Sequence, residues 1–138
     1  MSAQATSKSK EKDRVGVAPS IVWFEIPADN LERANRFYGA LFDWRIEPFP
    51  SRKDYWHIDT GGREDTPDGG LMARCHPQQT ITIHVNVKSV ANSMAKVEKL
   101  GGKVCGPKIA VPGRGYFAIC QDTENNTFAL WERDENAK

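Results

Sequence analysis

The feature that most constrains the fold is a plan that occurs twice along the chain: one strand, one helix and then three strands. The first copy runs from "SIVWFEIPAD" through "ADNLERANRFYGALFDW" to the extended segments "WRIEPF", "DYWHIDTG" and "GGLMARC". The second copy runs from "TITIHVNVKS" through "SVANSMAKVEKLGG" to "KVCGPKIAV", "GYFAICQD" and "NTFALWE". Trp23 and Thr82 hold matching places, about 59 residues apart, which is a length that suits one supersecondary unit per copy.

The chain has 138 residues, which is enough for one domain and too few for two ordinary ones. We expect a disordered polar tail over residues 1–19, a domain over residues 20–132 made of modules 20–76 and 80–132, and a flexible end over residues 133–138. In each module the helix covers one face of a sheet. The predicted fold is therefore α+β, with two tandem βαβββ modules that form a cupped mixed sheet and helices on its outer face.

Two local signals describe the first helix. Asp29 and Glu32 have the spacing of a capping box, in which each side chain accepts a hydrogen bond from a free N–H at the helix start. Apolar residues at helical spacing predict the stripe that this helix buries: Leu31, Ala34, Phe37 and Leu41, widened by Tyr38 and Phe42.

Signals of the same kind occur in the second module. Ser89 is placed to cap the second helix, and Gly101 or Gly102 supplies its left-handed end. At the last hairpin Asn125 and Asn126 stand where a residue with positive φ is often needed, and asparagine tolerates that conformation well.

Composition excludes several classes of protein. There are 19 basic and 18 acidic residues, a formal net charge of +1, and no segregation that indicates a nucleic-acid footprint or a membrane-surface patch. No apolar run reaches membrane-spanning length, and the lysines of the N-terminus precede no hydrophobic segment. The cysteines, Cys75, Cys105 and Cys120, are odd in number and form no C-x-x-C pair, which favours reduced thiols in the cytoplasm.

The two leading strands each have one unusual face. In the first, Phe24 and Ile26 alternate with Trp23 and Glu25, because side chains on a strand have period two. In the second, the aliphatic face is Ile81, Ile83, Val85 and Val87, and the opposite face is Thr82, His84 and Asn86. We expect the helices to cover the aliphatic faces and the opposite faces to line the cup.

Glu25 and His84 are the predicted chemical pair of that cup. Each lies two residues beyond a matching position of its module, so the pseudo-twofold relation brings them toward each other. A carboxylate beside an imidazole in a partly dry pocket can transfer protons, which suits isomerisation or hydration beside a carbonyl. The alternative is that the two residues only satisfy one another and fix packing.

Other residues complete the predicted site. Trp23 is expected to be an apolar wall of the ligand pocket, with Thr82 and Asn86 beside it. Tyr116 and Arg114, both in "VPGRGYF", are further candidates, the arginine for an anionic group on the ligand. Cys120 is expected to fill the core and not to act as a nucleophile.

His57 is the residue whose orientation the sequence leaves open. It shares a strand face with Tyr55 and Asp59. If that face also looks inward, His57, His84 and Glu25 form a two-histidine, one-carboxylate set that holds a divalent metal at a displaced position.

The stretches "WFEIPADNLERANRFYGALFDW", "GGLM", "VEKLGGKV", "VPGRGYFAICQD" and "FALWE" resemble the vicinal oxygen chelate superfamily, which includes glyoxalase I, bleomycin-resistance proteins and extradiol dioxygenases. The resemblance covers nearly all of residues 20–132 and is greatest to a bacterial glyoxalase-like branch. It implies the paired βαβββ fold, and homodimers are common among its members. Its chemistry is diverse, so the fold does not decide the function.

The resemblance also implies where a metal would bind. Laying glyoxalase I on this chain places its two histidines at Trp23 and Thr82, one carboxylate at Ala129 and the other within "GGLM", which contains no acid. An indole, a hydroxyl and a methyl do not replace imidazole and carboxylate as ligands of a divalent ion. We therefore predict no cofactor, while a displaced divalent metal stays an alternative.

Three functions remain open at this point, the third of which is a pure interaction module with a filled or collapsed cup. The first is a small-molecule-binding protein of the resistance or sequestration type. The second is a lyase or isomerase of the lactoylglutathione-lyase-related class, acting on a small carbonyl compound through Glu25 and His84, metal-free or with the displaced ion. We expect a small-molecule ligand or substrate and a cytoplasmic homodimer, with no nucleic-acid or membrane partner. The identity of the ligand, and whether one chain or two build the cup, do not follow from the sequence.

Overall fold

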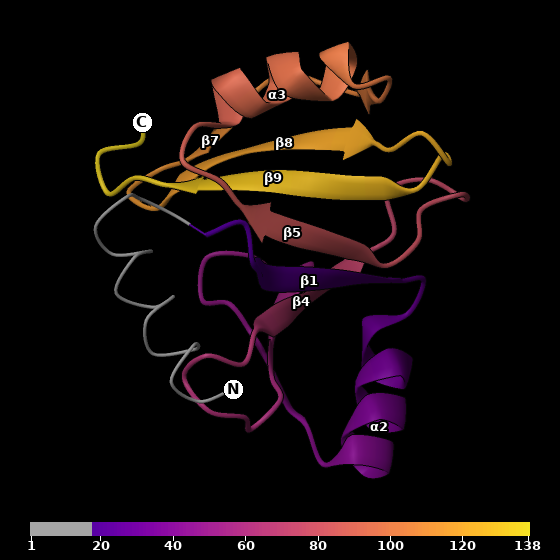
Figure 1. The fold of residues 1–138 in the computed structure, drawn as a ribbon. Helices are drawn as coiled ribbons and strands as arrows, with labels where there is room; N and C mark the ends of the chain where they lie inside the picture. Colours follow the sequence, from indigo (N-terminus) through magenta and orange to yellow (C-terminus); the bar gives the residue numbers. More distant parts are fainter. Residues whose placement is uncertain (1–17) are drawn as a thin grey trace, which may run out of the picture. The chain divides into compact units, whose positions relative to one another are not determined.

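The computed structural model describes residues 18–138, and the predicted tail lies almost wholly outside them. The described residues form two helices and nine strands (Figure 1). In chain order these are β1 (Ile21–Ala28), α2 (Leu31–Phe42), β2 (Arg45–Pro48), β3 (Tyr55–Asp59), β4 (Asp68–Ala73), β5 (Thr82–Asn86), α3 (Val90–Lys99), β6 (Lys103–Val104), β7 (Ile109–Val111), β8 (Gly115–Gln121) and β9 (Thr127–Arg133). Neither helix is long and apolar enough to cross a membrane.

The described chain divides into two compact units. The first unit comprises residues 21–84, and the second comprises residues 85–138 with residues 18–20. The division falls within β5, and the module boundaries at residues 76 and 80 stay a prediction. The first three residues of β5 fall in the same unit as β1, and His84 at their end contacts Glu25.

The sheet of the first unit has the strand order β2-β3-β4-β1, with the Thr82–His84 part of β5 next to β1. β1 and β4 are parallel, and β4-β3 and β3-β2 are antiparallel, so the sheet is mixed. The register sets Phe24 and Ile58 on either side of Gly69, and Glu25 and His57 on either side of Gly70. Neighbouring residues of the strands thus point alternately to two faces.

One face of this sheet is the core of the first unit. Its buried residues are Ile26, Ala28, Ile46, Ile58 and Leu71, with Phe24, Trp44 and Trp56 packed against them. Each fully buried aliphatic side chain contributes roughly 1.5–3 kcal/mol by removal from water. The prediction that Phe24 and Ile26 point into the core is confirmed. We refer to this as the core face.

Helix α2 packs on the core face with a narrower stripe than predicted. Leu31, Ala34 and Tyr38 contact the core, which confirms half of the expected set. Phe37 and Leu41, however, are 59% and 57% exposed, and Phe42 is also exposed. Spacing alone cannot give the angle at which a short helix meets its sheet. Here the contacting stripe is centred on positions 31, 34 and 38.

The ends of α2 differ in one detail from the prediction. The N-cap is Asn30, whose side-chain oxygen accepts a hydrogen bond from the Arg33 N–H, and not Asp29. Asp29 instead accepts a hydrogen bond from the Arg74 guanidinium. At the other end Asp43 takes the left-handed conformation, with φ 59°, and its N–H bonds to the Gly39 carbonyl.

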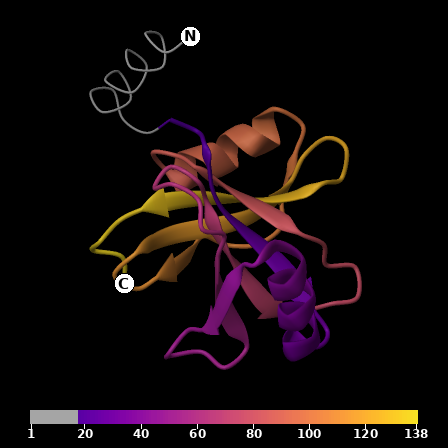
Figure 2. The same cartoon turned by 90° about the horizontal axis from the view of Figure 1, so that it is seen from below.

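The second unit contains an antiparallel sheet in the order β9-β8-β6, with β7 also paired to β8. Figures 1 and 2 both show β8 and β9 side by side. Helix α3 contacts these two strands and β6. The core beneath it contains Val90, Ala118, Cys120 and Leu130, so the expectation that Cys120 fills the core is confirmed.

Most local signals of the second module are confirmed. Ser89 caps α3 by accepting from the Asn92 N–H, Gly101 has φ 93°, and Asn125 has φ 64°. The prediction that a helix covers the aliphatic face of the second leading strand is wrong for two of its residues. Ile81 and Ile83 are exposed, whereas Thr82 and His84 on the opposite face are buried. The α3 core takes only Val87 from that predicted row.

Two further strand predictions need correction. The segment "KVCGPKIAV" is not one strand but two, β6 and β7, separated at Gly106 and Pro107, because proline has no N–H to donate to a ladder. Strand β9 extends to Arg133, one residue past the predicted boundary, and the buried Ala137 accepts a hydrogen bond from the Gly113 N–H. The α+β class, with a helix on one face of each unit's sheet, is confirmed. The cup between the modules stays a prediction.

Candidate functional site

The other face of the first unit's sheet contains the candidate site, and we refer to it as the site face. Glu25 of β1, Gly70 of β4 and His57 of β3 form one row across it. Trp23 and Asp68 form the next row, and Tyr55 lies diagonally across from Glu25. Side chains of neighbouring strands at matched register share a face, so this region gathers polar and aromatic groups that are far apart in sequence.

A chain of hydrogen bonds connects three of these residues. The Trp23 indole N–H donates to the Tyr55 hydroxyl at 2.8 Å. That hydroxyl donates in turn to Glu25 Oε2 at 2.6 Å. The short second distance is typical of a hydroxyl donating to a carboxylate, which is among the stronger hydrogen bonds in proteins.

His84 completes the cluster from the strand β5. Its Nε2 lies 3.3 Å from Glu25 Oε1, so both carboxylate oxygens are engaged. The side chains are 8% and 19% exposed for His84 and Glu25 respectively. The two residues thus lie together, as the sequence predicts; their catalytic role stays a prediction. We call Trp23, Tyr55, Glu25 and His84 the site cluster.

The surroundings set the protonation of the cluster. Burial raises the pKa of the Glu25 carboxyl, but the hydrogen bond and charge of His84, the hydrogen bond of Tyr55 and the charge of Arg52 outweigh it, so its pKa lies below the ordinary value. Burial, followed by the charge and hydrogen bond of Glu25, raises the pKa of Tyr55. The carboxyl is therefore ionised and the phenol protonated at neutral pH, which is the state that the observed hydrogen bonds require.

His57 faces the same side as the site cluster and pairs with a different acid. Its Nε2 lies 3.1 Å from Asp68 Oδ2, and the two side chains are 39% and 34% exposed. Its ring is parallel to that of Trp23, with centroids 5.9 Å apart, and Phe49 packs against it. The prediction left the orientation of His57 open, and the structure answers it: the residue shares the face with Trp23.

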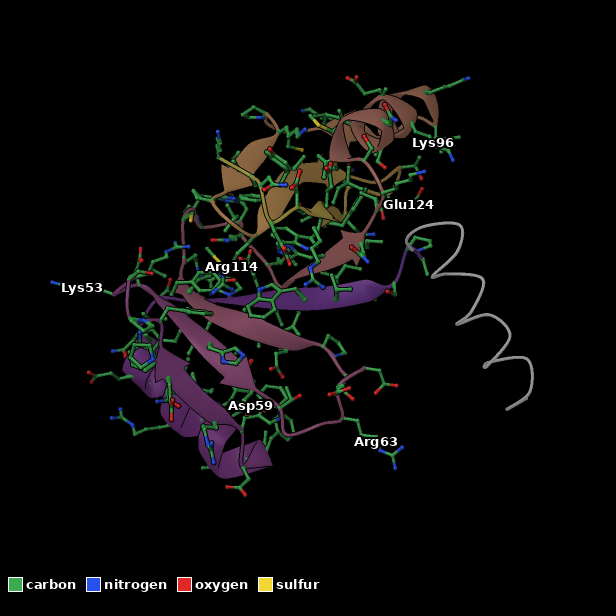
Figure 3. The ribbon with its side chains drawn as sticks, turned by 90° about the vertical axis from the view of Figure 1, so that its left-hand side faces the viewer. Lys53, Asp59, Arg63, Lys96, Arg114 and Glu124 are labelled. Atoms are coloured by element: carbon green, nitrogen blue, oxygen red, sulfur yellow. The ribbon has the colours of Figure 1, made fainter. Side chains whose placement is uncertain are left out.

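The displaced metal set does not assemble in this geometry. Among residues 18–138, no group of three or more His, Cys, Asp or Glu side chains could hold an ion together. His57 is paired with Asp68, and Glu25 with His84. Asp59, at the end of β3 in Figure 3, accepts a hydrogen bond from the Gly61 N–H.

The remaining predicted ligand contacts are distributed over both units. Thr82 is buried in the first unit, where its hydroxyl donates to the Thr80 carbonyl at 3.2 Å. In the second unit Asn86 ends β5, Tyr116 lies on β8 beneath the Lys108 ammonium, and Arg114 is exposed before β8 (Figure 3). The contact of these three residues with a ligand stays a prediction.

A separate open groove of about 380 Å³ lies on the helix side of the first unit, between the end of β1 and the start of α2. It contains none of the predicted site residues. Two arginines, Arg33 and Arg74, line the groove, and Arg74 is already bound by Asp29 and by the carbonyls of Gln79 and Pro27.

Two residues of the site face have no role in the sequence analysis. The sequence puts Tyr55 on the same strand face as His57, leaves the orientation of that face open and gives Tyr55 no role, although it is the centre of the hydrogen-bond chain. Gly70 received no mention as a site residue, although a side chain there would collide with the Tyr55 ring. The doubled glycine in "GGLM", at a strand position, is the signal that a neighbouring ring occupies the space.

Comparisons with known proteins agree with this fold. Residues 20–61 match the family described as bleomycin resistance protein-like N-terminal. A glyoxylase-like domain-containing protein of Didymella fabae is 30% identical over 117 residues, which are 79% of this chain and 90% of that protein. The chain therefore belongs to the glyoxalase-like proteins of the vicinal oxygen chelate superfamily.

Solved structures show the same fold at low identity. A glyoxalase/bleomycin resistance protein/dioxygenase superfamily member from Vibrio splendidus is 10% identical with a TM-score of 0.60, over 85% of this chain and 100% of that one. A Streptomyces coelicolor methylmalonyl-CoA epimerase is 12% identical with a TM-score of 0.59, over 87% and 98%. The Mn(II)-bound glyoxalase of Novosphingobium aromaticivorans is 17% identical with a TM-score of 0.56, over 85% and 38%.

Proposed function

We propose that the protein binds a small organic molecule, without a metal, against the site face of its first unit. The observation that carries this proposal is the site cluster itself: a tryptophan, a tyrosine, an ionised glutamate and a histidine joined at 2.6–3.3 Å on a sheet face opposite the core. Around it, Trp23, Phe49 and His57 are partly exposed rings. Ligand sites typically combine such apolar walls with a few oriented polar groups.

The donor chemistry supports the metal-free form of the proposal. At the positions where the resemblance implies ligands, the Trp23 indole donates to Tyr55, the Thr82 hydroxyl donates to Thr80, and Ala129 has only a methyl. Divalent transition-metal ions are typically bound by imidazole, carboxylate or thiolate groups, and none of these three positions has such a group. The usual metal site of the superfamily therefore does not fit these residues.

The ligand class follows from the same groups. Flat apolar contact from Trp23 and Phe49 favours a planar or unsaturated ligand. The His57 imidazole, oriented by Asp68 and more than a third exposed, offers a polar contact beside those rings. We infer a small molecule with one conjugated or carbonyl-bearing plane and a hydrogen-bonding group at its edge.

A thermal-shift screen tests the proposal. The panel contains small aldehydes, α-ketoacids, hemithioacetals and flat heteroaromatic compounds, each added to wild type and to Trp23→Ala. A ligand at a hundredfold its Kd adds about 2.7 kcal/mol of stability. We expect at least one compound to raise the Tm of wild type and not of Trp23→Ala, with Ile26→Val as a control on the core face of the same strand. Equal shifts in wild type and Trp23→Ala would place the ligand elsewhere and refute the proposal.

A second candidate function is an isomerase or lyase acting on a small carbonyl compound. The 3.3 Å approach of His84 Nε2 to Glu25 Oε1 favours it, because a carboxylate–imidazole pair can pass a proton. Glu25→Gln should then abolish turnover while the fold remains intact. The metal-assisted form requires stoichiometric Zn, Ni, Mn or Fe in elemental analysis of the natively purified protein.

We further propose that the protein is a cytoplasmic homodimer. The three cysteines are free, which is compatible with a reducing compartment, and exposed apolar side chains on α2 provide a surface for association. Sedimentation of the purified protein tests the dimer, and a monomer at micromolar concentration would contradict it.

A further inference from the structure

Gly70 provides the space in which the Tyr55 ring of the site cluster lies. Gly70 lies between Glu25 and His57 in one row of the sheet, and it is the member of that row without a side chain. A Cβ built on Gly70 would overlap the outer ring carbons and the hydroxyl of Tyr55, well inside van der Waals contact. The tyrosine ring therefore lies directly over the glycine, in the space that any other residue would fill.

The position of its ring over Gly70 determines the direction in which the Tyr55 side chain points. Its backbone is paired with Met72, one row beyond Gly70 on the same face, so the ring must cross Gly70 diagonally to reach Glu25. There its hydroxyl accepts from the Trp23 indole and donates to Glu25 Oε2. Because the hydroxyl accepts one hydrogen bond and donates its single proton in another, its orientation is fixed. It therefore holds one oxygen of the Glu25 carboxylate in place.

We infer that Tyr55, seated on Gly70, is the positioning residue that fixes the Glu25 carboxylate in the site cluster. Tyr55 is buried, and its one hydroxyl proton is donated to Glu25, so it acts by orienting the acid. The inference rests on the proposed function in that it concerns the same site. Its test uses no ligand, so either statement can fail without the other.

The neighbouring glycine provides a matched control. A Cβ on Gly69 would overlap the Phe24 ring on the core face, as closely as a Cβ on Gly70 overlaps Tyr55 on the site face. Both glycines are buried in β4, and in both cases the obstacle is the outer part of an aromatic side chain. Gly69→Ala and Gly70→Ala are thus the same substitution, one residue apart, aimed at opposite faces.

The experiment is an NMR titration of the Glu25 carboxyl carbon in wild type, Tyr55→Phe, Gly70→Ala and Gly69→Ala. Removing the hydroxyl, or displacing the ring that bears it, withdraws a hydrogen bond from the ionised carboxylate, so the titration midpoint of Glu25 moves to higher pH. In the same samples the Trp23 indole N–H loses its acceptor and exchanges faster with solvent. Gly69→Ala leaves both signals as in wild type, although it lowers the Tm through Phe24.

Two outcomes would overturn the inference. The first is a Tyr55→Phe variant whose Glu25 midpoint and Trp23 exchange match those of wild type. The second is a Gly69→Ala variant that moves both signals as far as Gly70→Ala does, which would mean that any strain in β4 has this effect. If Gly70→Ala does not fold, Tyr55→Phe decides alone, since it keeps the ring and removes only the hydroxyl.

Discussion

The two faces of the first unit's sheet each pack an aromatic ring over a glycine of β4, but the groups around the two rings differ. On each face a glycine of β4 leaves a space that an aromatic ring from a neighbouring strand fills: Phe24 over Gly69 on the core face, and Tyr55 over Gly70 on the site face. Phe24 is surrounded by aliphatic side chains under α2. Tyr55 contacts the Glu25 carboxylate and the Trp23 indole N–H, with the Arg52 guanidinium over its ring and Phe49 beside it.

The difference shows what a functional face retains. Filling a buried surface with aliphatic residues stabilises a protein, whereas burying a carboxylate requires partners to offset its desolvation. The site face keeps an acid that must be held by both Tyr55 and His84. Stability alone would favour apolar groups there, which is why we propose a ligand for this face.

The largest effect should come from the core face. Leu71 is completely buried among Ile26, Ile46 and Ile58, so Leu71→Ala leaves a cavity and removes apolar contacts. We expect the free energy of unfolding, measured by urea titration, to fall by about 2–5 kcal/mol. A loss below about 1 kcal/mol would indicate that this face is not closely packed.

A smaller effect is expected from the site face. Tyr55→Phe retains the ring over Gly70 but removes a hydrogen bond to a charged group, which lowers the free energy of unfolding by roughly 1.5–3 kcal/mol. The same urea titration measures it. An unchanged midpoint would show that Glu25 gains nothing from Tyr55, and the contrast between the two faces would lose its basis.

A smaller effect again is expected at the N-terminus of α2, the helix that covers the core face. Asn30→Ala removes the observed N-cap of α2, and the expected loss in unfolding free energy is ~1 kcal/mol. Asp29→Ala, at the position that the sequence favours, removes only a largely exposed ion pair with Arg74 and should change stability less. The reverse order of the two variants would mean that Asp29 is the true cap.

The last prediction concerns the loss of stability in acid, which begins only when the pH falls below the ordinary pKa of a glutamate. Because the pKa of Glu25 is depressed in the folded state, its contribution to stability is present above the unfolded value of 4.5 and is lost as the pH falls through the folded value. Between the unfolded-state and the folded-state pKa of Glu25, the unfolding free energy of wild type should therefore fall more steeply with decreasing pH than that of Glu25→Gln. Thermal unfolding from pH 7 to pH 3 measures the difference, and parallel curves would contradict the assignment.

Much of the fold could be predicted from the sequence, because its signals are local or periodic. Alternation in β1 predicted which of Phe24 and Glu25 meets the core, and Ser89 and Asn125 were predicted to cap α3 and to turn the last hairpin. The errors have two causes. The stripe of α2 depends on tertiary geometry, namely the angle at which the helix meets the sheet, whereas the break between β6 and β7 has a local cause, Pro107, which the sequence analysis does not weigh.

The candidate site was predicted in part. Parity along two strands was sufficient to propose Glu25 with His84 and to give Trp23 to the same face. Tyr55 and Gly70 were missed because their roles depend on the register between β3, β4 and β1, which no single strand reveals. The pairing of His57 with Asp68 was missed for the same reason: it is diagonal across two strands.

The most direct test of the central claim, that the site face and not the core face meets a ligand, uses the indole N–H signals of the tryptophans. Trp23 lies on the site face, whereas Trp44 and Trp56 pack against the core. A compound that raises the Tm of wild type is titrated into ¹⁵N-labelled protein. The account predicts that the Trp23 signal shifts and that those of Trp44 and Trp56 do not. A binding compound that shifts Trp44 or Trp56 and leaves Trp23 unchanged would contradict it.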